Sequence, residues 1–153
     1  MDHKRKESAR LLPPLSRKLI GIEFGLGPFY IDKQKVIGLA EILGDPNLSH
    51  IASGIDAVPP YYLVTLLSDK DPIGDRPDIL FAGLHGEFFA PIKIGDTITG
   101  KGEISDVFEK KGRSGKMIFV VAELLYNNQQ GERVAKLQLS WVRRDKYEQG
   151  IDQ

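Results

Sequence analysis

The chain has 153 residues, the size of one ordinary domain, and lysine plus arginine balance aspartate plus glutamate at 21 each, so no net field draws it to nucleic acid or a membrane surface. It contains no cysteine, which excludes disulfides and thiolate chemistry. Its apolar runs are far shorter than the roughly 20 residues of a membrane-spanning helix, so we expect a cytoplasmic protein.

The composition divides the chain into three expected segments. Residues 1–16 are basic and polar and contain Pro13 and Pro14, which predicts a flexible N-terminal arm. Residues 17–145 carry the regular apolar patterns and are expected to form one domain. Residues 146–153 form a polar C-terminal tail.

The first half of the domain predicts a strand followed by a helix. Residues 20–30 combine apolar and aromatic side chains with three glycines, which indicates a bent or bulged strand. Asp32 can cap the helix that follows, and Gly44 suits its left-handed end. One apolar stripe recurs at helical spacing between them: Val36, Leu39, Ala40 and Leu43. The next residues, 48–58, are expected to be irregular.

A second helix is expected over residues 61–68. Pro59 and Pro60 suit its first turn, because proline is tolerated where the backbone N–H would have no partner. Its sequence, YYLVTLLS, is apolar on nearly every side, which predicts a helix buried in the core.

Four long strands joined by turns fill the second half, at residues 79–92, 97–110, 116–127 and 133–143. The third is apolar on both faces and should be covered on both sides, whereas the fourth alternates apolar and polar residues and should be half-buried. An antiparallel sheet with one apolar helix packs most simply by curling around that helix. We therefore expect an α+β hot-dog domain, with the sheet wrapped around one buried central helix.

The stretch GDPNLSH, residues 44–50, places Asp45, Asn47 and His50 within seven residues. By itself this pattern is more typical of a helix end followed by an Asx turn than of a catalytic site. A second polar pair, His85 and Glu87, flanks Gly86 and should lie on one face of a strand. The three histidines of the chain show no metal-ligand spacing, so no metal site is proposed.

Two longer stretches carry a family resemblance: PIKIGDTI, residues 91–98, and FVVAELLYNNQQGERVA, residues 119–135. In this order they resemble the MaoC-type dehydratase and (R)-specific enoyl-CoA hydratase family. AVPPYYLVTL, residues 57–66, is similar to its N-terminal dehydratase-domain branch. The resemblance covers roughly residues 19–144. It implies reversible hydration of a 2-enoyl thioester of CoA or acyl carrier protein to the (3R)-hydroxyacyl thioester, without a cofactor.

The family signature is Gly-Asp-x-Asn-Pro-aliphatic-His, and this chain matches it at Gly44, Asp45, Asn47 and His50. Leu48 and Ser49 replace the usual proline and aliphatic residue. The resemblance implies that Asp45 and His50 are the acid/base pair and that Asn47 supports them. Four further residues are expected near the acyl thioester: Tyr61, Tyr62, Phe81 and His85. A basic cluster, Lys110, Lys111, Arg113 and Lys116, is either a solvated turn or a contact for the CoA phosphate or a carrier protein.

One departure from the family pattern keeps two functions open. Active members usually have a glycine at the start of the central helix, whose N–H binds the thioester enolate, but Pro59 has no N–H and neither has Pro60. The branch with this Pro-Pro pair includes non-catalytic, acyl-binding subunits of heteromeric hydratases. The chain is thus expected to be a hydratase or such a subunit, in a homodimer or in a heterodimer with another hot-dog chain. A thioesterase is a third alternative.

Overall fold

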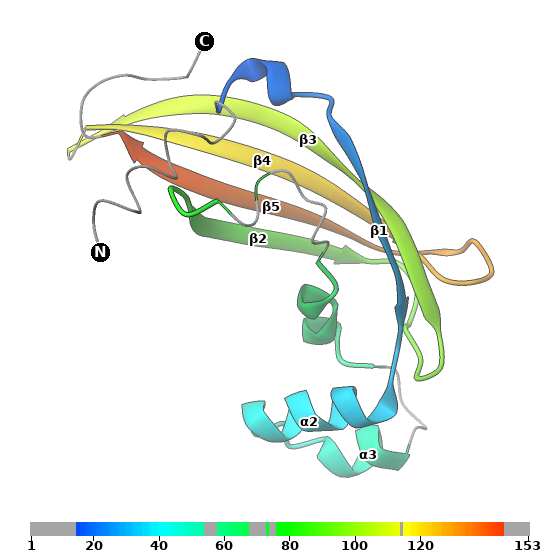
Figure 1. The fold of residues 1–153 in the computed structure, drawn as a ribbon. Coiled ribbons are helices and arrows are strands. Elements are labelled where there is room, and N and C mark those ends of the chain that lie inside the picture. Colours follow the sequence, from blue (N-terminus) through cyan, green and yellow to red (C-terminus); the bar gives the residue numbers. More distant parts are fainter. Residues whose placement is uncertain (1–14, 54–57, 68–72, 74–75, 114, 146–153) are drawn as a thin grey trace.

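Five antiparallel strands form one curved sheet in the order β1-β3-β4-β5-β2 (Figure 1). The computed structural model describes residues 15–53, 58–67, 73, 76–113 and 115–145. The strands are β1 (Glu23–Tyr30), β2 (Leu80–Phe88), β3 (Thr97–Gly112), β4 (Gly115–Asn127) and β5 (Arg133–Asp145). The helical elements are η1 (Arg17–Leu19), α2 (Lys33–Leu43), α3 (Leu48–Ser53) and η2 (Pro60–Thr65). Most of the expected arm, up to residue 14, lies outside the described residues, as does the tail 146–153.

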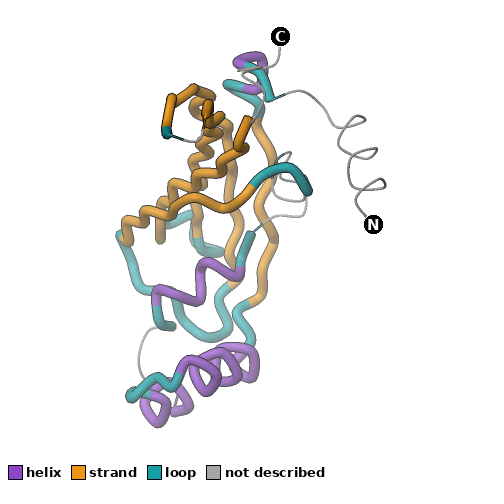
Figure 2. Tube along the Cα trace, turned by 90° about the vertical axis from the view of Figure 1, so that its left-hand side faces the viewer, coloured by secondary structure: helices purple, strands orange, loops and turns teal. Residues whose placement is uncertain are grey.

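The elements form three tiers, which both views show (Figures 1 and 2). The sheet is the first tier, η2 lies beneath its concave face, and α2 and α3 lie side by side beyond η2. The predicted α+β architecture, one antiparallel sheet curved over a central helical segment, is therefore confirmed. No helix in the described part of the chain is long and apolar enough to cross a membrane.

Strand β1 is bent, as its glycines predict. It pairs with β3 from Glu23 to Tyr30, and the register shifts between Leu26 and Phe29. Gly27, in this bulge, has a φ of 78°, and a Cβ there would approach the carbonyl oxygen of Ile98 to 2.6 Å. Only glycine lets the backbone of β1 come this close to β3. The bulge redirects the chain toward α2.

The capping residues of α2 behave as predicted. Oδ2 of Asp32 accepts a hydrogen bond from the N–H of Lys35 at 3.1 Å, and Gly44 adopts the left-handed conformation with a φ of 64°. The apolar stripe is buried only in part: Val36 and Ala40 have no exposed surface, whereas Leu43 is 57% exposed. The C-terminal end of α2 therefore projects beyond the core.

The expectation that residues 48–58 are irregular is wrong for the first six of them, which form α3. The N–H of Ile51 donates to the carbonyl of Asn47 at 3.0 Å and closes the first turn, and the Ile51 side chain is buried. The burial of this residue and the packing of α3 against α2 stabilise a helix that is too short to form alone.

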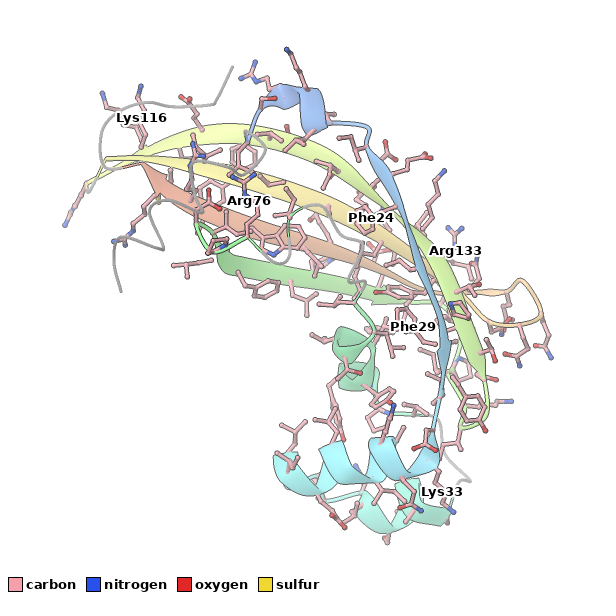
Figure 3. All side chains as sticks on the ribbon, viewed as in Figure 1. Phe24, Phe29, Lys33, Arg76, Lys116 and Arg133 are labelled. Carbon is pink, nitrogen blue, oxygen red and sulfur yellow. The ribbon has the colours of Figure 1, made fainter. Side chains whose placement is uncertain are left out.

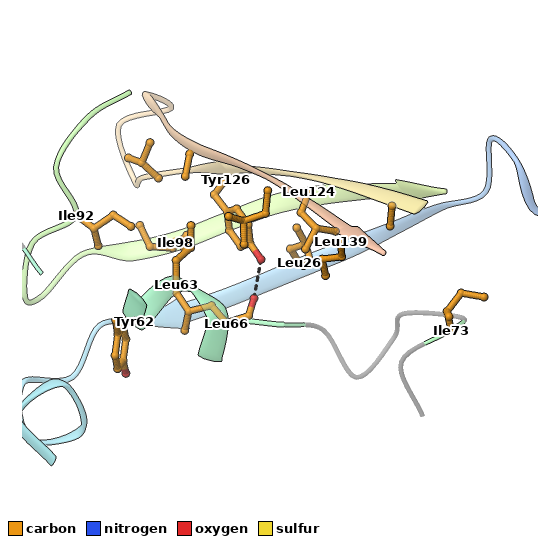
Figure 4. Close-up of a cluster of buried hydrophobic side chains, with 14 of the residues drawn as sticks. Leu26, Tyr62, Leu63, Leu66, Ile73, Ile92, Ile98, Leu124, Tyr126 and Leu139 are labelled. Carbon is orange, nitrogen blue, oxygen red and sulfur yellow. Dashed lines mark hydrogen bonds between the residues drawn. The ribbon is translucent and has the colours of Figure 1, made fainter. Parts of the chain in front are cut away.

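The central helix is shorter and tighter than predicted. Instead of a helix over residues 61–68, η2 is a 3₁₀-helix of six residues, and Ser68 lies outside the described residues. It buries one side only: Tyr62 and Leu63 are buried, whereas Thr65 is exposed. Its end is fixed by the sheet, because the hydroxyl of buried Tyr126 donates to the carbonyl of Leu66 at 2.9 Å (Figure 4).

The burial of the strands confirms one prediction and corrects another. On β5 the alternation is as expected, with Ala135, Leu137, Leu139 and Trp141 buried. On β4 the residues of one face, such as Val120, are buried, but those of the other face, such as Val121, are only half-buried. The prediction that β4 is covered on both sides is therefore wrong, because η2 packs on the concave face alone.

Strand β2 is an edge strand, and several of its large apolar side chains are exposed to solvent. It pairs with β5 on one side, and no described strand pairs with its other side. Five large apolar residues on or beside it are 44% to 69% exposed: Leu80, Phe81, Leu84, Phe88 and Phe89. An apolar edge of this kind is a template for pairing with another chain.

Candidate functional site

The site predicted from the sequence lies in the turn that joins α2 to α3. Helix α2 ends in a Schellman motif: the N–H of Gly44 donates to the carbonyl of Glu41 at 3.1 Å, and that of Asp45 to the carbonyl of Ala40 at 2.9 Å. The helix end and the site are thus the same structure. The αL residue turns the chain sharply, and Asp45 follows it at a fixed place against the helix.

Two donors from different elements hold the carboxylate of Asp45. Oδ1 accepts the N–H of Asn47 at 2.8 Å, an Asx turn within the loop. Oδ2 accepts the hydroxyl hydrogen of Tyr61, also at 2.8 Å. Tyr61 belongs to the first turn of η2, sixteen residues along the chain. The carboxylate therefore joins the α2–α3 turn to the central helix, and its side chain is half-buried.

These contacts shift the pKa of both side chains, Asp45 and Tyr61. The Asn47 N–H, and after it the Tyr61 hydroxyl, lower the pKa of Asp45 below its ordinary value, because both stabilise the charged form. Desolvation, together with the adjacent carboxylate, raises the pKa of Tyr61 to about 12. At neutral pH the pair is an ionised carboxylate facing a protonated phenol.

His50 lies on α3 with an exposed imidazole, five residues beyond Asp45. Its backbone carbonyl accepts the hydroxyl hydrogen of Ser53 at 2.6 Å, which strengthens the short helix. The structure thus presents a half-buried carboxylate and an exposed imidazole from one helix–turn–helix unit. A carboxylate and an imidazole are two of the side-chain types that general acid/base chemistry uses.

The start of η2 has few free backbone donors. Pro59 has no N–H and neither has Pro60, and the N–H of Tyr62 donates to the carbonyl of Pro59 at 3.0 Å. Two backbone N–H groups could replace the donor that the prolines remove, those of Tyr61 and Tyr62, and the N–H of Tyr62 is already used in the turn.

Two hollows flank η2. The larger has a volume of ≈ 700 Å³ and lies between the end of β1, α2 and η2. Its lining is formed by Pro28, Phe29, Tyr30, Asp32, Lys35, Leu39, Tyr62, Thr65 and Leu66. The smaller, of ≈ 390 Å³, lies between Pro59, Pro60 and the apolar end of β2 at Phe88 and Phe89. The larger is within the usual size range of small-molecule sites.

The structure brings together only some of the residues predicted near the substrate. Tyr61 contacts Asp45, and Tyr62, the next residue, lines the larger hollow. Phe81 and His85 instead lie on β2, at the exposed edge of the sheet. His85 is within 4.0 Å of Glu87, so these two side chains share one face of the strand as predicted.

The basic cluster occupies the tip of the β3–β4 hairpin, at the opposite end of the molecule from α2 (Figure 3, Lys116 and Lys33). There the ammonium of Lys110 lies over the stacked rings of Phe108 and Phe119, at 5.7 and 5.6 Å from their centroids. This placement favours the solvated-turn interpretation. The residues with assigned positions include no group of three or more potential metal ligands.

The contact between Tyr61 and Asp45 is the feature of the candidate site that sequence reasoning missed. The sequence assigned Tyr61 to the acyl chain, and Asp45 to the pair with His50. No local periodicity connects residues 45 and 61, since their contact depends on how η2 docks against the α2–α3 turn. The only signal was Pro59-Pro60, which predicts a rigid start to the element that carries Tyr61.

Comparison with known proteins identifies the family and the fold of the chain. Residues 18–137 match the family described as FAS1-like, dehydratase domain region. No curated protein sequence matches the chain. Several solved structures do resemble it in fold.

A monoamine oxidase regulatory protein from Archaeoglobus has a TM-score of 0.70 at 18% identity, over 88% of this chain and 95% of its own. A MaoC-like dehydratase from Rhodospirillum rubrum has a TM-score of 0.62 at 19% identity, over 82% and 94%. The HadBC (3R)-hydroxyacyl-ACP dehydratase complex from Mycobacterium tuberculosis has a TM-score of 0.63 at 18% identity, over 83% and 99%. The chain therefore belongs to the FAS1-like dehydratase-region family and has the hot-dog fold of the MaoC-type dehydratases.

Proposed function

We propose that this chain is a hydro-lyase that reversibly adds water to a 2-enoyl thioester of CoA or acyl carrier protein, giving the (3R)-hydroxyacyl thioester. The observation that carries the proposal is the α2–α3 turn, where the Schellman end of α2 fixes Asp45 and α3 presents His50. The family match over residues 18–137 and the dehydratases among the similar structures support the reaction class.

The reaction needs two proton transfers. One O–H bond of water breaks as its oxygen bonds to C3, and C2 receives a proton as the C2–C3 π bond is lost. Asp45 and His50 hold the water between them and carry out these transfers. The acyl chain lies along η2 in the larger hollow, because Tyr61 contacts Asp45 while the adjacent Tyr62 lines that hollow.

The test is the hydration of crotonyl-CoA and of a longer 2-enoyl-CoA, followed by loss of the ultraviolet absorbance of the conjugated thioester. Asp45→Asn and His50→Ala should each abolish most of the activity. Asp106→Asn is the matched control, because Asp106 also accepts a backbone N–H, that of Val107 at 2.8 Å, but lies on β3. Wild-type activity that survives both substitutions at the site would refute the assignment.

A second function, a non-catalytic acyl-binding subunit, is favoured by the start of η2. Pro59 and Pro60 remove backbone donors where active family members are expected to supply one, and the N–H of Tyr62 is already used. In that case the isolated chain binds acyl-CoA without hydrating it, and activity appears only with a second hot-dog chain. Full activity of the purified chain alone would exclude this function.

For either function, we propose that the partner chain binds along the free edge of strand β2. Its free edge and its exposed Leu80, Leu84 and Phe88 suit antiparallel pairing with the edge of another hot-dog domain. The HadBC relative is a complex by name, and we propose a dimer, of two copies or with a second hot-dog chain. Sedimentation should show a dimer that Leu84→Lys dissociates, whereas Ile20→Lys, at a 42% exposed residue near η1, should leave it intact.

A further inference from the structure

The hydrogen bond between Tyr61 and Asp45 restrains the orientation of the carboxylate in a way that the Asx turn alone does not. The N–H of Asn47 reaches Oδ1 from two residues away, so that bond forms wherever the turn forms. The Tyr61 hydroxyl reaches Oδ2 from a separate element. One donor on each oxygen fixes the plane of the carboxylate as well as its position.

The fixed carboxylate still has room for a reacting water. Each carboxylate oxygen offers two lone-pair directions. The Asn47 N–H and the Tyr61 hydroxyl occupy one on each oxygen, and a weaker contact from the Asn47 side chain still leaves at least one direction for water. Because the Asp45 side chain is half-buried, water can approach from the open side. Tyr61 therefore orients the acceptor without blocking it.

Two prolines at the start of η2, Pro59 just before it and Pro60 as its first residue, contribute to the placement of the phenol. Pro59 has a φ of −57° and a ψ of 137°, so the chain enters η2 from an extended, ring-locked conformation. Tyr61 follows directly, and the N–H of Tyr62 closes the turn on Pro59. The rigid backbone thus sets the direction of the Tyr61 Cα–Cβ bond, and the hydrogen bond to Asp45 holds the ring.

We propose that Tyr61 is a positioning residue for the hydration described above, because its hydroxyl holds the Asp45 carboxylate in the orientation in which it accepts a hydrogen bond from the reacting water. This rests on the proposed function. Asp45 and His50 then have different roles: Asp45 accepts the hydrogen bond from the water, and His50 carries the proton between the water and C2. Tyr61 keeps its own proton, since its pKa is about 12.

The direct test is Tyr61→Phe, which removes one oxygen and keeps the ring. We expect kcat for enoyl-CoA hydration to fall about 10- to 100-fold, the usual effect of losing a hydrogen bond to a charged group, with a smaller change in KM. The acidic limb of the pH profile should move to higher pH, because the pKa of Asp45 loses one of the contacts that lower it. Tyr126→Phe is the control: it removes another hydrogen-bonded tyrosine hydroxyl, lowers stability, and should leave that limb in place.

A readout without catalysis separates this proposal from the proposed function. Carbon-detected NMR should show the carboxyl titration of Asp45 shifted upward in Tyr61→Phe and unchanged in Tyr126→Phe. If Tyr61→Phe does not fold, Asp45→Asn serves instead, and the Tyr61 ring should then titrate below its wild-type pKa of about 12. An inactive wild-type chain with the expected NMR shifts would refute the hydratase function alone. The role of Tyr61 would be overturned if the wild-type chain is active and Tyr61→Phe changes neither the acidic limb of the pH profile nor the titration of Asp45.

Discussion

The hydrogen bond from Tyr126 to Leu66 connects the sheet to the end of η2, and Tyr126→Phe should measure its strength. The phenol has no exposed surface and donates at 2.9 Å, while Leu66, whose carbonyl accepts it, is only 6% exposed. Removal of the hydroxyl leaves a buried carbonyl without this donor, so the free energy of unfolding should fall by about 1–3 kcal/mol. With an unfolding entropy of roughly 2.1 cal/mol/K per residue over 153 residues, this corresponds to a Tm lower by about 3–9 °C.

Urea denaturation of wild type and Tyr126→Phe, followed by circular dichroism, is the assay. Tyr30→Phe is the control, because Tyr30 is 65% exposed and its hydroxyl should matter by less than about 0.5 kcal/mol. Burial also raises the pKa of Tyr126, so the unfolded chain loses this proton first. Wild-type stability should therefore decline as the pH rises above about 10, and less steeply in Tyr126→Phe. A Tyr126→Phe protein as stable as Tyr30→Phe would refute the reasoning.

Two further pairs of substitutions test the packing and the acyl site. A Cβ on Gly100 would collide with the backbone carbonyl oxygen of Leu125, so Gly100→Ala should lower the free energy of unfolding, measured by urea denaturation, by more than about 2 kcal/mol. Gly25 has open space around it, and Gly25→Ala should lower it by less than about 1 kcal/mol. Equal losses of stability in the two variants would contradict this. Leu39→Trp should fill the larger hollow and raise KM for a long 2-enoyl-CoA but not for crotonyl-CoA. Ile42→Trp, at an 82% exposed position of the same helix, should change neither KM. An unchanged KM for the long substrate in Leu39→Trp would mean that the acyl chain binds elsewhere.

The parts of the fold that depend on local chemistry could be predicted from the sequence. Asp32 and Gly44 mark the two ends of α2 because capping and the left-handed conformation are properties of single residues. The alternation of β5 likewise requires only a sheet with one covered face.

The parts that were missed depend on distant contacts. The end of η2 is set by Tyr126, sixty residues away, and no pattern within YYLVTLLS contains that information. Helix α3 is stabilised by the burial of Ile51 and by packing against α2, and the partner of Tyr61 depends on how η2 docks against the α2–α3 turn. The residue types of the candidate site were readable in the sequence, but the contact that orients Asp45 was not.

The strand order also has a consequence for how the protein folds. Strands β3, β4 and β5 are neighbours both in sequence and in space, so this meander can form through short-range contacts. Strands β1 and β2 join its two outer sides, and the chain between them carries the α2–α3 turn and η2. We therefore expect α2, α3 and η2 to become ordered only once both outer strands have docked. These three helical elements should exchange their amide hydrogens before the meander does, and residues in them can change without disturbing the meander.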